Sequence, residues 1–497
     1  MNTPPTTPDA NEGEASGSVA RNALVRMAGE ILAKTASVVF FILIARKLGE
    51  EAFGDFTFAL SLTSVLLFAA GLGTEELTTR EIARDRSTVH LYITNVILIK
   101  TITSFLLVVA SVLIVVLGSY PAEVQLTVLL VGAGVAFENT GRSYWSAFQA
   151  FERQEYVSLS LIVQRFATLI GCIVVLVAGG GLVAVAAVFL GGAVLNLFTV
   201  RWALRRFVVK LRFDVDVARW WPIARAGLPI GVVTVLGGLT LRLDATLISF
   251  FTPGSGNAEV GYFGAAFRLV EATLFIGWGF NAAALPWLAQ QTGDALRHGF
   301  ELGTKAVAGL LAPIGVILCV LAEPIIELVY GAQYEPAVLP LRYLGLSVVA
   351  YSINFYFSTV LVARDKPTAF ARAQLVALGV NVAVNAYVIP RHGAAGAAAV
   401  ALGTGALLAV LGAIQVQRVI GRASLLRGLL SPTVAALAMA GVIELTQLPL
   451  VPAALLGLVV YGATALAVER VVYPDDLAMA RVLVSRLRRR RVAALAD

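Results

Sequence analysis

Two charged residues, Arg268 and Glu271, lie three positions apart inside the apolar stretch "NAEVGYFGAAFRLVEATLFIGWGF". A second apolar stretch, about twenty-four residues earlier, carries Arg242 and Asp244. The planar guanidinium group of arginine suits the oxygens of a phosphate group. A carboxylate in the same place can pair with the arginines or carry an ion. These residues therefore predict an anion-binding site with acidic partners.

A third group of charges lies near the start of the chain. Arg26, Glu30 and Lys34 are spaced four residues apart, which places all three on one face of a helix. At a rise of about 1.5 Å per residue they extend from the membrane boundary towards its middle. We expect Arg26 and Lys34 to join the cationic set and Glu30 to join the acidic partners.

The composition indicates a polytopic, all-α membrane protein. Hydrophobic residues make up 58% of the 497 residues and charged residues only 14%, which leaves too few charges for the surface of a soluble protein. Cys172 and Cys319 both lie in apolar runs, so neither a disulfide framework nor a metal site is expected. No cofactor and no nucleic-acid partner are expected either.

A helix that crosses a membrane needs about 20 mostly apolar residues. Fourteen segments satisfy this requirement: 21–46, 52–73, 89–118, 122–149, 155–179, 181–207, 221–251, 259–290, 300–322, 337–363, 368–389, 394–417, 427–446 and 450–472.

Basic residues predict the orientation of these segments. They gather in alternate connections: Arg80, Arg84, Arg86, Arg153, Arg205, Arg206, Lys210, Arg212, Arg219, Arg297, Arg364, Lys366, Arg418 and Arg422. The other connections, such as "GSYPAEVQ" and "FTPGSGNAEV", contain no lysine or arginine, and only Arg46, Lys47 and Arg391 break this pattern. We therefore expect an even number of spans and both termini in the cytoplasm. The expected location is the cytoplasmic membrane of the cell.

Two similar segments suggest an internal repeat. Aligning "EEAFGDFTFALSL" with "NAEVGYFGAAFRL" matches Gly54 with Gly261 and Phe56 with Phe263, six spans apart. Such an offset predicts two parallel lobes around a central cavity. The expected divisions are a disordered tail (1–20), an N-terminal six-helix lobe (21–207), a linker (208–220), a C-terminal six-helix lobe (221–418), two additional spans (424–472) and a basic tail (473–497).

Charged residues within spans are expected to face such a cavity rather than lipid. An ion pair that only fixes helix packing explains any single pair equally well, whereas the combined cations Arg26, Lys34, Arg242 and Arg268 favour a binding site. Elsewhere, Glu138 and Arg142 are spaced to pair within one helix, and Lys100 is expected to extend to the membrane boundary.

Four stretches carry a resemblance to a known family. "ARKLGEEAFGDFTFALSL", "AEVGYFGAAFRL", "ELVYGAQYEPAVLPLRYLGLS" and "RHGAAGAAAVALGTG" occur in this order and together extend the similarity over about residues 20–472. In this respect the chain resembles the polysaccharide flippases of the MOP superfamily, which move lipid-linked oligosaccharides.

The resemblance implies a two-lobed transporter that works by alternating access. Its substrate would be a polyprenyl-diphosphate-linked saccharide, with the diphosphate near Arg26, Arg242 and Arg268 and the tail in a groove between helices. Asp244 and Glu271 would be charge partners or would couple transport to H⁺ or Na⁺. Membrane lipids and the polysaccharide polymerase machinery are the other partners implied.

Other functions stay open at this stage. Lipid II flipping and multidrug or cation antiport belong to the same superfamily, although a cation exporter would favour an acidic cavity. A saccharide polymerase or ligase would need carboxylates or a metal on a sizeable outer loop, and the outer loops here are short and carry few charges. No enzymatic activity is therefore expected. The absence of a G-x-x-x-x-G-K-[ST] sequence also argues against ATP as the direct energy source.

Overall fold

The computed structural model is all-α, as the composition predicts. It describes residues 9–71, 73–252 and 257–474, with side chains from residue 29 onward except those of residues 229, 230, 278 and 282. Among the described residues there is no β-strand. The first helices are α1 (Asp9–Gly71), α2 (Thr74–Arg84), α3 (Val89–Leu117), α4 (Ala122–Ala150), α5 (Gln154–Val177), α6 (Leu182–Phe207) and α7 (Trp220–Phe251). The remaining helices are α8 (Ala258–Gln290), α9 (Gly293–Val320), α10 (Ala322–Tyr330), α11 (Val338–Ala363), α12 (Pro367–Ile420), α13 (Leu425–Thr446) and α14 (Leu450–Val472).

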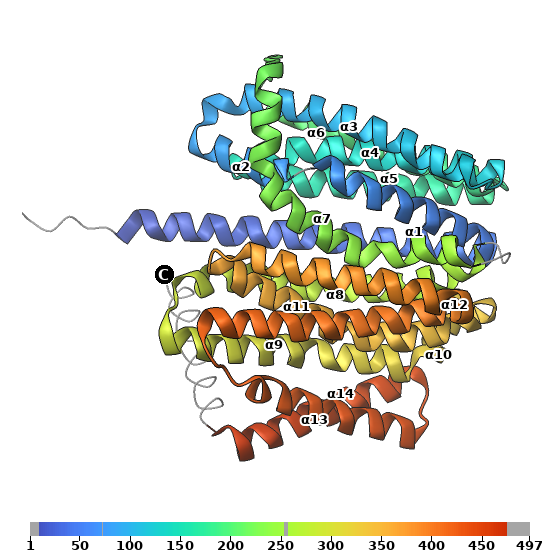
Figure 1. Ribbon diagram of the computed structural model, residues 1–497, viewed down its shortest axis with the longest axis vertical. Helices are drawn as coiled ribbons and strands as arrows, with labels where there is room; N and C mark the ends of the chain where they lie inside the picture. The colour runs from blue at the N-terminus through green and yellow to red at the C-terminus, as the bar shows by residue number, and fades with distance from the viewer. Residues whose placement is uncertain (1–8, 72, 253–256, 475–497) are drawn as a thin grey trace, which may run out of the picture. The chain divides into compact units, whose positions relative to one another are not determined.

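All fourteen predicted spans lie in these helices because α1 and α12 each hold two of them. At 63 and 54 residues, α1 and α12 are far longer than one crossing needs. Each is broken at a glycine in the left-handed backbone region, Gly49 (φ 84°) and Gly393 (φ 50°). In α1 the chain turns back there, and the rings of Phe41 and Phe53, on opposite sides of the break, lie 6.5 Å apart (Figure 1).

Eleven helical stretches among the described residues are long and apolar enough to span a membrane. Their outer faces carry large exposed apolar side chains. On α3, for example, Phe105 is 65% exposed and Leu106 60%. Such a face would be unfavourable in water and suits the hydrocarbon of a bilayer. The protein is therefore a multi-pass membrane protein.

One tail prediction needs correction. Residues 9–20, expected to be disordered, form the beginning of α1. Residues 1–8 and 475–497, which include most of the predicted basic tail, lie outside the described residues.

The chain divides into two compact units. The first unit contains the residues up to Arg268 together with Val382–Ala394, and the second contains Leu269–Asn381 and the chain from Ala395 onward. The boundaries fall inside α8 and α12. The six-helix lobes expected at 21–207 and 221–418 stay a prediction.

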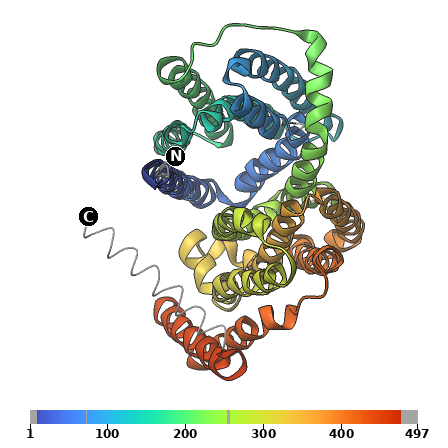
Figure 2. The ribbon, with the colours of Figure 1, turned by 90° about the vertical axis from the view of Figure 1, so that its left-hand side faces the viewer.

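In the first unit, α4 packs against α3 and α6, and α5 packs against α1 and α6. Figure 2, turned by 90°, looks nearly along the axes of these helices. Their core includes Ile93, Phe148 and Leu204, which are almost completely buried. α7 packs against α1 and α2, so the first unit contains helices from both sides of the 208–220 linker.

The linker itself is attached to α3 by hydrogen bonds to three α3 side chains, and Asn95 makes most of them. The Asn95 amide, which is completely buried, donates to the Asp214 carbonyl oxygen at 2.8 Å. Its oxygen accepts from the Asp216 backbone N–H (2.9 Å) and from Nε1 of Trp220 (2.8 Å). These bonds satisfy backbone groups that a loop would otherwise leave to water. The linker is thus part of the first unit.

In the second unit, α9 packs against α11 and α13, and α13 packs against α14. A cluster around Met439, Ile443 and Tyr461 forms the core between these helices. Nζ of Lys305 on α9 lies 3.0 Å from the Glu469 carboxylate on α14, and both side chains are about 15% exposed or less. This ion pair attaches the last helix to the unit.

Candidate functional site

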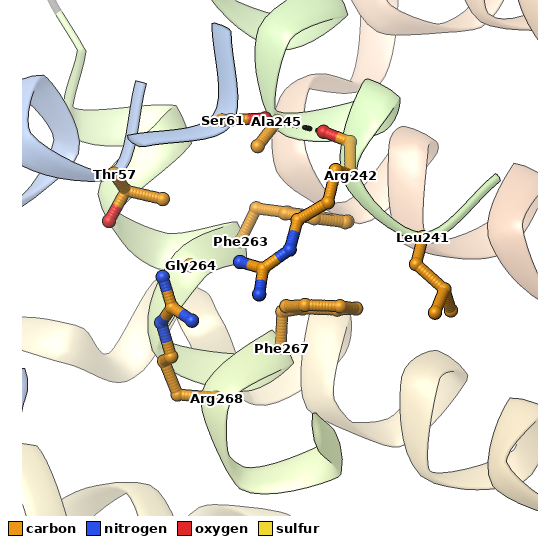
Figure 3. Close-up of a pocket in the computed structure, with 9 residues that line it drawn as sticks. All are labelled: Thr57, Ser61, Leu241, Arg242, Ala245, Phe263, Gly264, Phe267 and Arg268. Atoms are coloured by element: carbon orange, nitrogen blue, oxygen red, sulfur yellow. Dashed lines mark hydrogen bonds between the residues drawn. The ribbon is translucent and has the colours of Figure 1, made fainter. Parts of the chain in front are cut away.

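A small pocket in the first unit brings together two of the predicted cations. Its nine lining residues are Thr57, Ser61, Leu241, Arg242, Ala245, Phe263, Gly264, Phe267 and Arg268. They come from the second half of α1, from α7 and from the start of α8. Figure 3 shows the guanidinium groups of Arg242 and Arg268 extending into the same space (Figure 3). The sequence prediction that these two residues share a site is consistent with this geometry.

Close packing between α1 and α8 forms one wall of the pocket. A methyl group added at Gly264 would lie 2.8 Å from Cγ2 of Thr57 and 2.9 Å from its Oγ1. Any larger residue at 264 would push the two helices apart or displace Thr57. The glycine therefore holds Thr57 against α8, at the edge of the pocket.

Each arginine is oriented by an aromatic ring. The guanidinium carbon of Arg268 lies 3.7 Å from the centroid of Phe41, and Arg268 is only 7% exposed. The guanidinium carbon of Arg242 lies 5.8 Å from the centroid of Phe267. A guanidinium group stacked on a ring keeps its N–H groups in its own plane, where they can donate to an anion.

Hydroxyl groups hold α1 and α7 together beside the arginines. Ser61 Oγ donates to the carbonyl oxygen of Arg242 and lies 2.9 Å from Oγ1 of Thr246. These contacts fix the backbone from which the Arg242 side chain extends. Ser61 therefore positions the Arg242 side chain. The sequence analysis did not include Ser61 among the site residues.

Asp244 has a partner that the sequence prediction missed. It is 3% exposed and accepts a hydrogen bond of 2.8 Å from Nδ2 of Asn385 on α12. A buried carboxylate needs such a donor. A signal for this partner was present in the sequence. Asn381 and Asn385 lie four residues apart in the apolar stretch "NVAVNAYV" and so share a helix face.

The other predicted site residues are not gathered at this pocket. Glu30 and Lys34 are half-buried on α1, one turn apart. Glu271 is half-buried on α8 and belongs to the second unit. Arg26 lies in α1, but its side chain is outside the described residues. The assignment of these four residues to a common site stays a prediction.

Lys100 is not at the membrane boundary, so that expectation was wrong. Its side chain is completely buried, its Nζ lies 2.6 Å from the Glu75 carboxylate, and it donates to the Asn139 carbonyl oxygen at 3.4 Å. Glu75 lies in the first turn of α2, where the helix dipole also favours its negative charge. A nearby carboxylate thus allows the lysine to stay inside the helix bundle.

Glu138 likewise has a partner on another helix. Its carboxylate lies 3.3 Å from Nη1 of Arg165 on α5 and accepts a hydrogen bond from the Gln164 amide. Arg142, the expected partner, has its guanidinium carbon 5.5 Å from the ring centroid of Trp145. The inter-helix pair connects α4 to α5, which a pair within one helix would not do. Among the described residues, no group of three His, Cys, Asp or Glu side chains is placed to hold a metal ion.

Fold and site define a multi-pass helical membrane protein with a buried cationic pocket. The family model for polysaccharide biosynthesis proteins matches residues 19–292, and the MatE family model matches residues 239–387. The chain belongs to the polysaccharide biosynthesis protein family. The resemblance to the flippases of the MOP superfamily is thereby confirmed.

Solved structures share the fold. The lipid II flippase MurJ in an inward closed conformation is 15% identical, with a TM-score of 0.75 over 90% of this chain and 99% of that chain. A multidrug resistance MATE family transporter of the MOP superfamily, inward-facing, is 16% identical, with a TM-score of 0.66 over 80% of this chain and 98% of that chain. A MATE transporter from Vibrio cholerae gives 16% identity and a TM-score of 0.57 over 81% and 98% of the two chains. No curated protein sequence matches the chain. The fold is that of the MOP-superfamily transporters.

Proposed function

We propose that this protein moves a polyprenyl-diphosphate-linked oligosaccharide across the cytoplasmic membrane, from the cytoplasmic to the outer leaflet, by alternating access. The observation that carries the proposal is the convergence of Arg242 and Arg268, from two different helices, on one pocket. Family membership connects the chain with polysaccharide biosynthesis. The fold, shared with membrane transporters, supports movement of a substrate rather than its synthesis.

The chemistry of the pocket suits a phosphate headgroup. Two arginines that line one pocket can both donate hydrogen bonds to a single anionic group. The in-plane N–H groups of a guanidinium match the spacing of phosphate oxygens. A sugar without phosphate would gain little from the two charges. The diphosphate of a lipid-linked saccharide therefore supplies the anion that this pocket favours.

We assign the carboxylate of Asp244 to coupling with H⁺ or Na⁺, together with Glu30 and Glu271 as charge partners. Asp244 is 3% exposed and hydrogen-bonded to Asn385. Ionisable groups inside the membrane are costly and most often serve transport. The alternation of connections rich in lysine and arginine with connections that carry few of them supports an orientation with both termini in the cytoplasm.

The test is complementation of a bacterial strain that lacks its own polysaccharide flippase. Arg242→Ala and Arg268→Ala are expected to abolish surface polysaccharide while the amount of protein in the membrane stays normal. Arg391→Ala is the matched control. Arg391 also stacks on a ring, with its guanidinium carbon 3.8 Å from the centroid of Tyr387, but it is exposed and does not line the pocket. Full complementation by both pocket variants would overturn the proposal.

A lipid II flippase would use the same two arginines, because lipid II also carries a polyprenyl diphosphate. The observation favouring it is the similarity to the lipid II flippase fold over nearly the whole chain. A second strain, depleted of its lipid II flippase, distinguishes the two functions. Growth rescue there, with no restoration of surface polysaccharide in the first strain, would assign the protein to lipid II.

A further inference from the structure

Thr57 is a neutral pocket residue whose hydroxyl makes no hydrogen bond within the part of the chain that the structure describes. It is 5% exposed, and its Oγ1 has no hydrogen-bond partner among the described residues. A buried hydroxyl without a partner costs about 1–3 kcal/mol. Other threonines on the same stretch avoid this cost. Thr63, for example, donates to the Ala59 carbonyl oxygen at 2.7 Å within its own helix.

The surroundings of Thr57 show where its partner would lie. Thr57 lines the pocket with Arg242 and Arg268, and Gly264 is the residue packed against it from α8. A methyl group at 264 would come within 2.9 Å of the Thr57 hydroxyl oxygen, so only glycine lets α8 pack this closely against Thr57. The hydroxyl therefore has no hydrogen-bond partner among the described residues although its side chain lies beside the two arginines.

We propose that Thr57 donates a hydrogen bond from Oγ1 to a phosphate oxygen of the lipid headgroup that Arg242 and Arg268 bind. This inference rests on the proposed function and adds a neutral donor to its two cations. A hydroxyl can donate one proton in a defined direction, whereas the arginines attract any anion that fits. Thr57 thus orients a phosphoryl group at the pocket, and Gly264 lets α8 pack closely enough to hold Thr57 beside the two arginines.

The experiment measures binding to the purified full-length protein in detergent by isothermal titration. Three probes are used: undecaprenyl diphosphate, undecaprenyl monophosphate and inorganic diphosphate. Thr57→Val removes the hydroxyl and retains the shape, whereas Thr57→Ser retains the hydroxyl. We expect Thr57→Val to weaken undecaprenyl diphosphate binding about tenfold to a hundredfold, the range for a hydrogen bond to a charged group. Thr57→Ser is expected to stay within about threefold of the natural protein.

Two further variants separate binding from folding. Thr63→Val removes a hydroxyl from the same helix outside the pocket and is expected to leave binding unchanged. Gly264→Ala retains the Thr57 hydroxyl but displaces it from its position beside the arginines, and is expected to weaken binding about as much as Thr57→Val. Should Thr57→Val prove too unstable to purify, Gly264→Ala and Thr57→Ser give the same comparison.

The outcomes distinguish the inference from the proposed function. Normal binding by Thr57→Val and Gly264→Ala, with binding lost in Arg268→Ala, overturns the role of Thr57 and leaves the proposed function intact. Absence of binding of either lipid by the natural protein overturns both. Binding of inorganic diphosphate alone would make this a free-anion site and would overturn the assignment to a lipid headgroup. Retention by Thr57→Ser together with loss in Thr57→Val establishes the hydroxyl as the phosphate donor.

Discussion

Gly54 of α1 and Gly261 of α8 cross with their backbones in direct contact, and the contact is reciprocal. A methyl group on Gly54 would collide with the Asn257 carbonyl oxygen, and one on Gly261 would collide with the Glu50 carbonyl oxygen. In the aligned repeat segments, Gly54 corresponds to Gly261 and Glu50 to Asn257. Such reciprocity is what a local two-fold axis between the two segments produces. The crossing also brings Thr57 close to Gly264.

Replacing either crossing glycine should separate the helices. We expect Gly261→Val to lower the free energy of unfolding by about 3 kcal/mol or more, because the collision is with backbone atoms that cannot rotate away. The measurement is the midpoint of thermal aggregation in detergent. Gly237→Ala on α7, where nothing lies within 4 Å, is the control and should be neutral or slightly stabilising. Equal melting of the natural protein and Gly261→Val would contradict the crossing.

The buried Lys100–Glu75 pair leads to a second prediction. Lys100→Met leaves the Glu75 carboxylate beside the core without its cation and should cost about 3–5 kcal/mol. The double variant Lys100→Met/Glu75→Leu should recover most of this stability, since it removes both charges. Lys366→Met, at an exposed position, is the control. A double variant as unstable as the single one would show that the pair is not the cause.

Asn95 provides a third prediction, concerning the linker. Asn95→Leu removes the acceptor for the Asp216 N–H and Trp220 Nε1, and should cost about 2 kcal/mol or more. Lys210 and Arg212 are already exposed, but trypsin needs a locally flexible backbone, so loosening of the linker should speed cleavage there. The rate of cleavage between the two halves is the readout. Val108→Ala, a core truncation at the far end of α3, controls for general destabilisation. Equal cleavage rates in the two variants would mean that the Asn95 hydrogen bonds do not fix the linker.

The Lys305–Glu469 pair gives a fourth prediction, for the second unit. In the structure, Lys305 Nζ lies 3.0 Å from the Glu469 carboxylate. Lys305→Glu replaces this attraction by repulsion between two negative charges, and should lower the thermal midpoint by several degrees. The charge-swapped double variant Lys305→Glu/Glu469→Lys should restore most of the loss. This coupling, measured as a double-mutant cycle, isolates the pair from other effects of each substitution. Additive losses in the double variant would argue against a direct ion pair between α9 and α14.

Two of the family-like stretches meet in the structure, which their separation in sequence does not show. The Glu259 carboxylate accepts a hydrogen bond of 2.6 Å from the Ala394 N–H, at the start of the second half of α12. Gly393, just before it, has no side chain that would collide with this carboxylate. The acid of "AEVGYFG" thus caps the helix that begins in "RHGAAG".

The sequence by itself determined the long apolar helices, although not the start of α1 or the short helices α2 and α10. A run of about 20 apolar residues is a local property, and every predicted span lies in a helix, including the pairs separated by Gly49 and Gly393. The charge types at Arg242, Arg268 and Asp244 were equally readable, because a charge within an apolar run is visible without any knowledge of its neighbours. The alignment of Gly54 with Gly261 also identified two similar segments, but not that they cross.

Only the tertiary structure decided which groups meet. Glu138 contacts Arg165 on α5 rather than Arg142 one turn away, and Lys100 is buried because α2 supplies Glu75. Asp244 is hydrogen-bonded by Asn385, about 140 residues later in the chain. Helix periodicity specifies the face on which a residue lies but not the helix that covers that face. Partner choice depends on how far each helix is rotated and shifted against its neighbours, and that is set by the packing of all of them together.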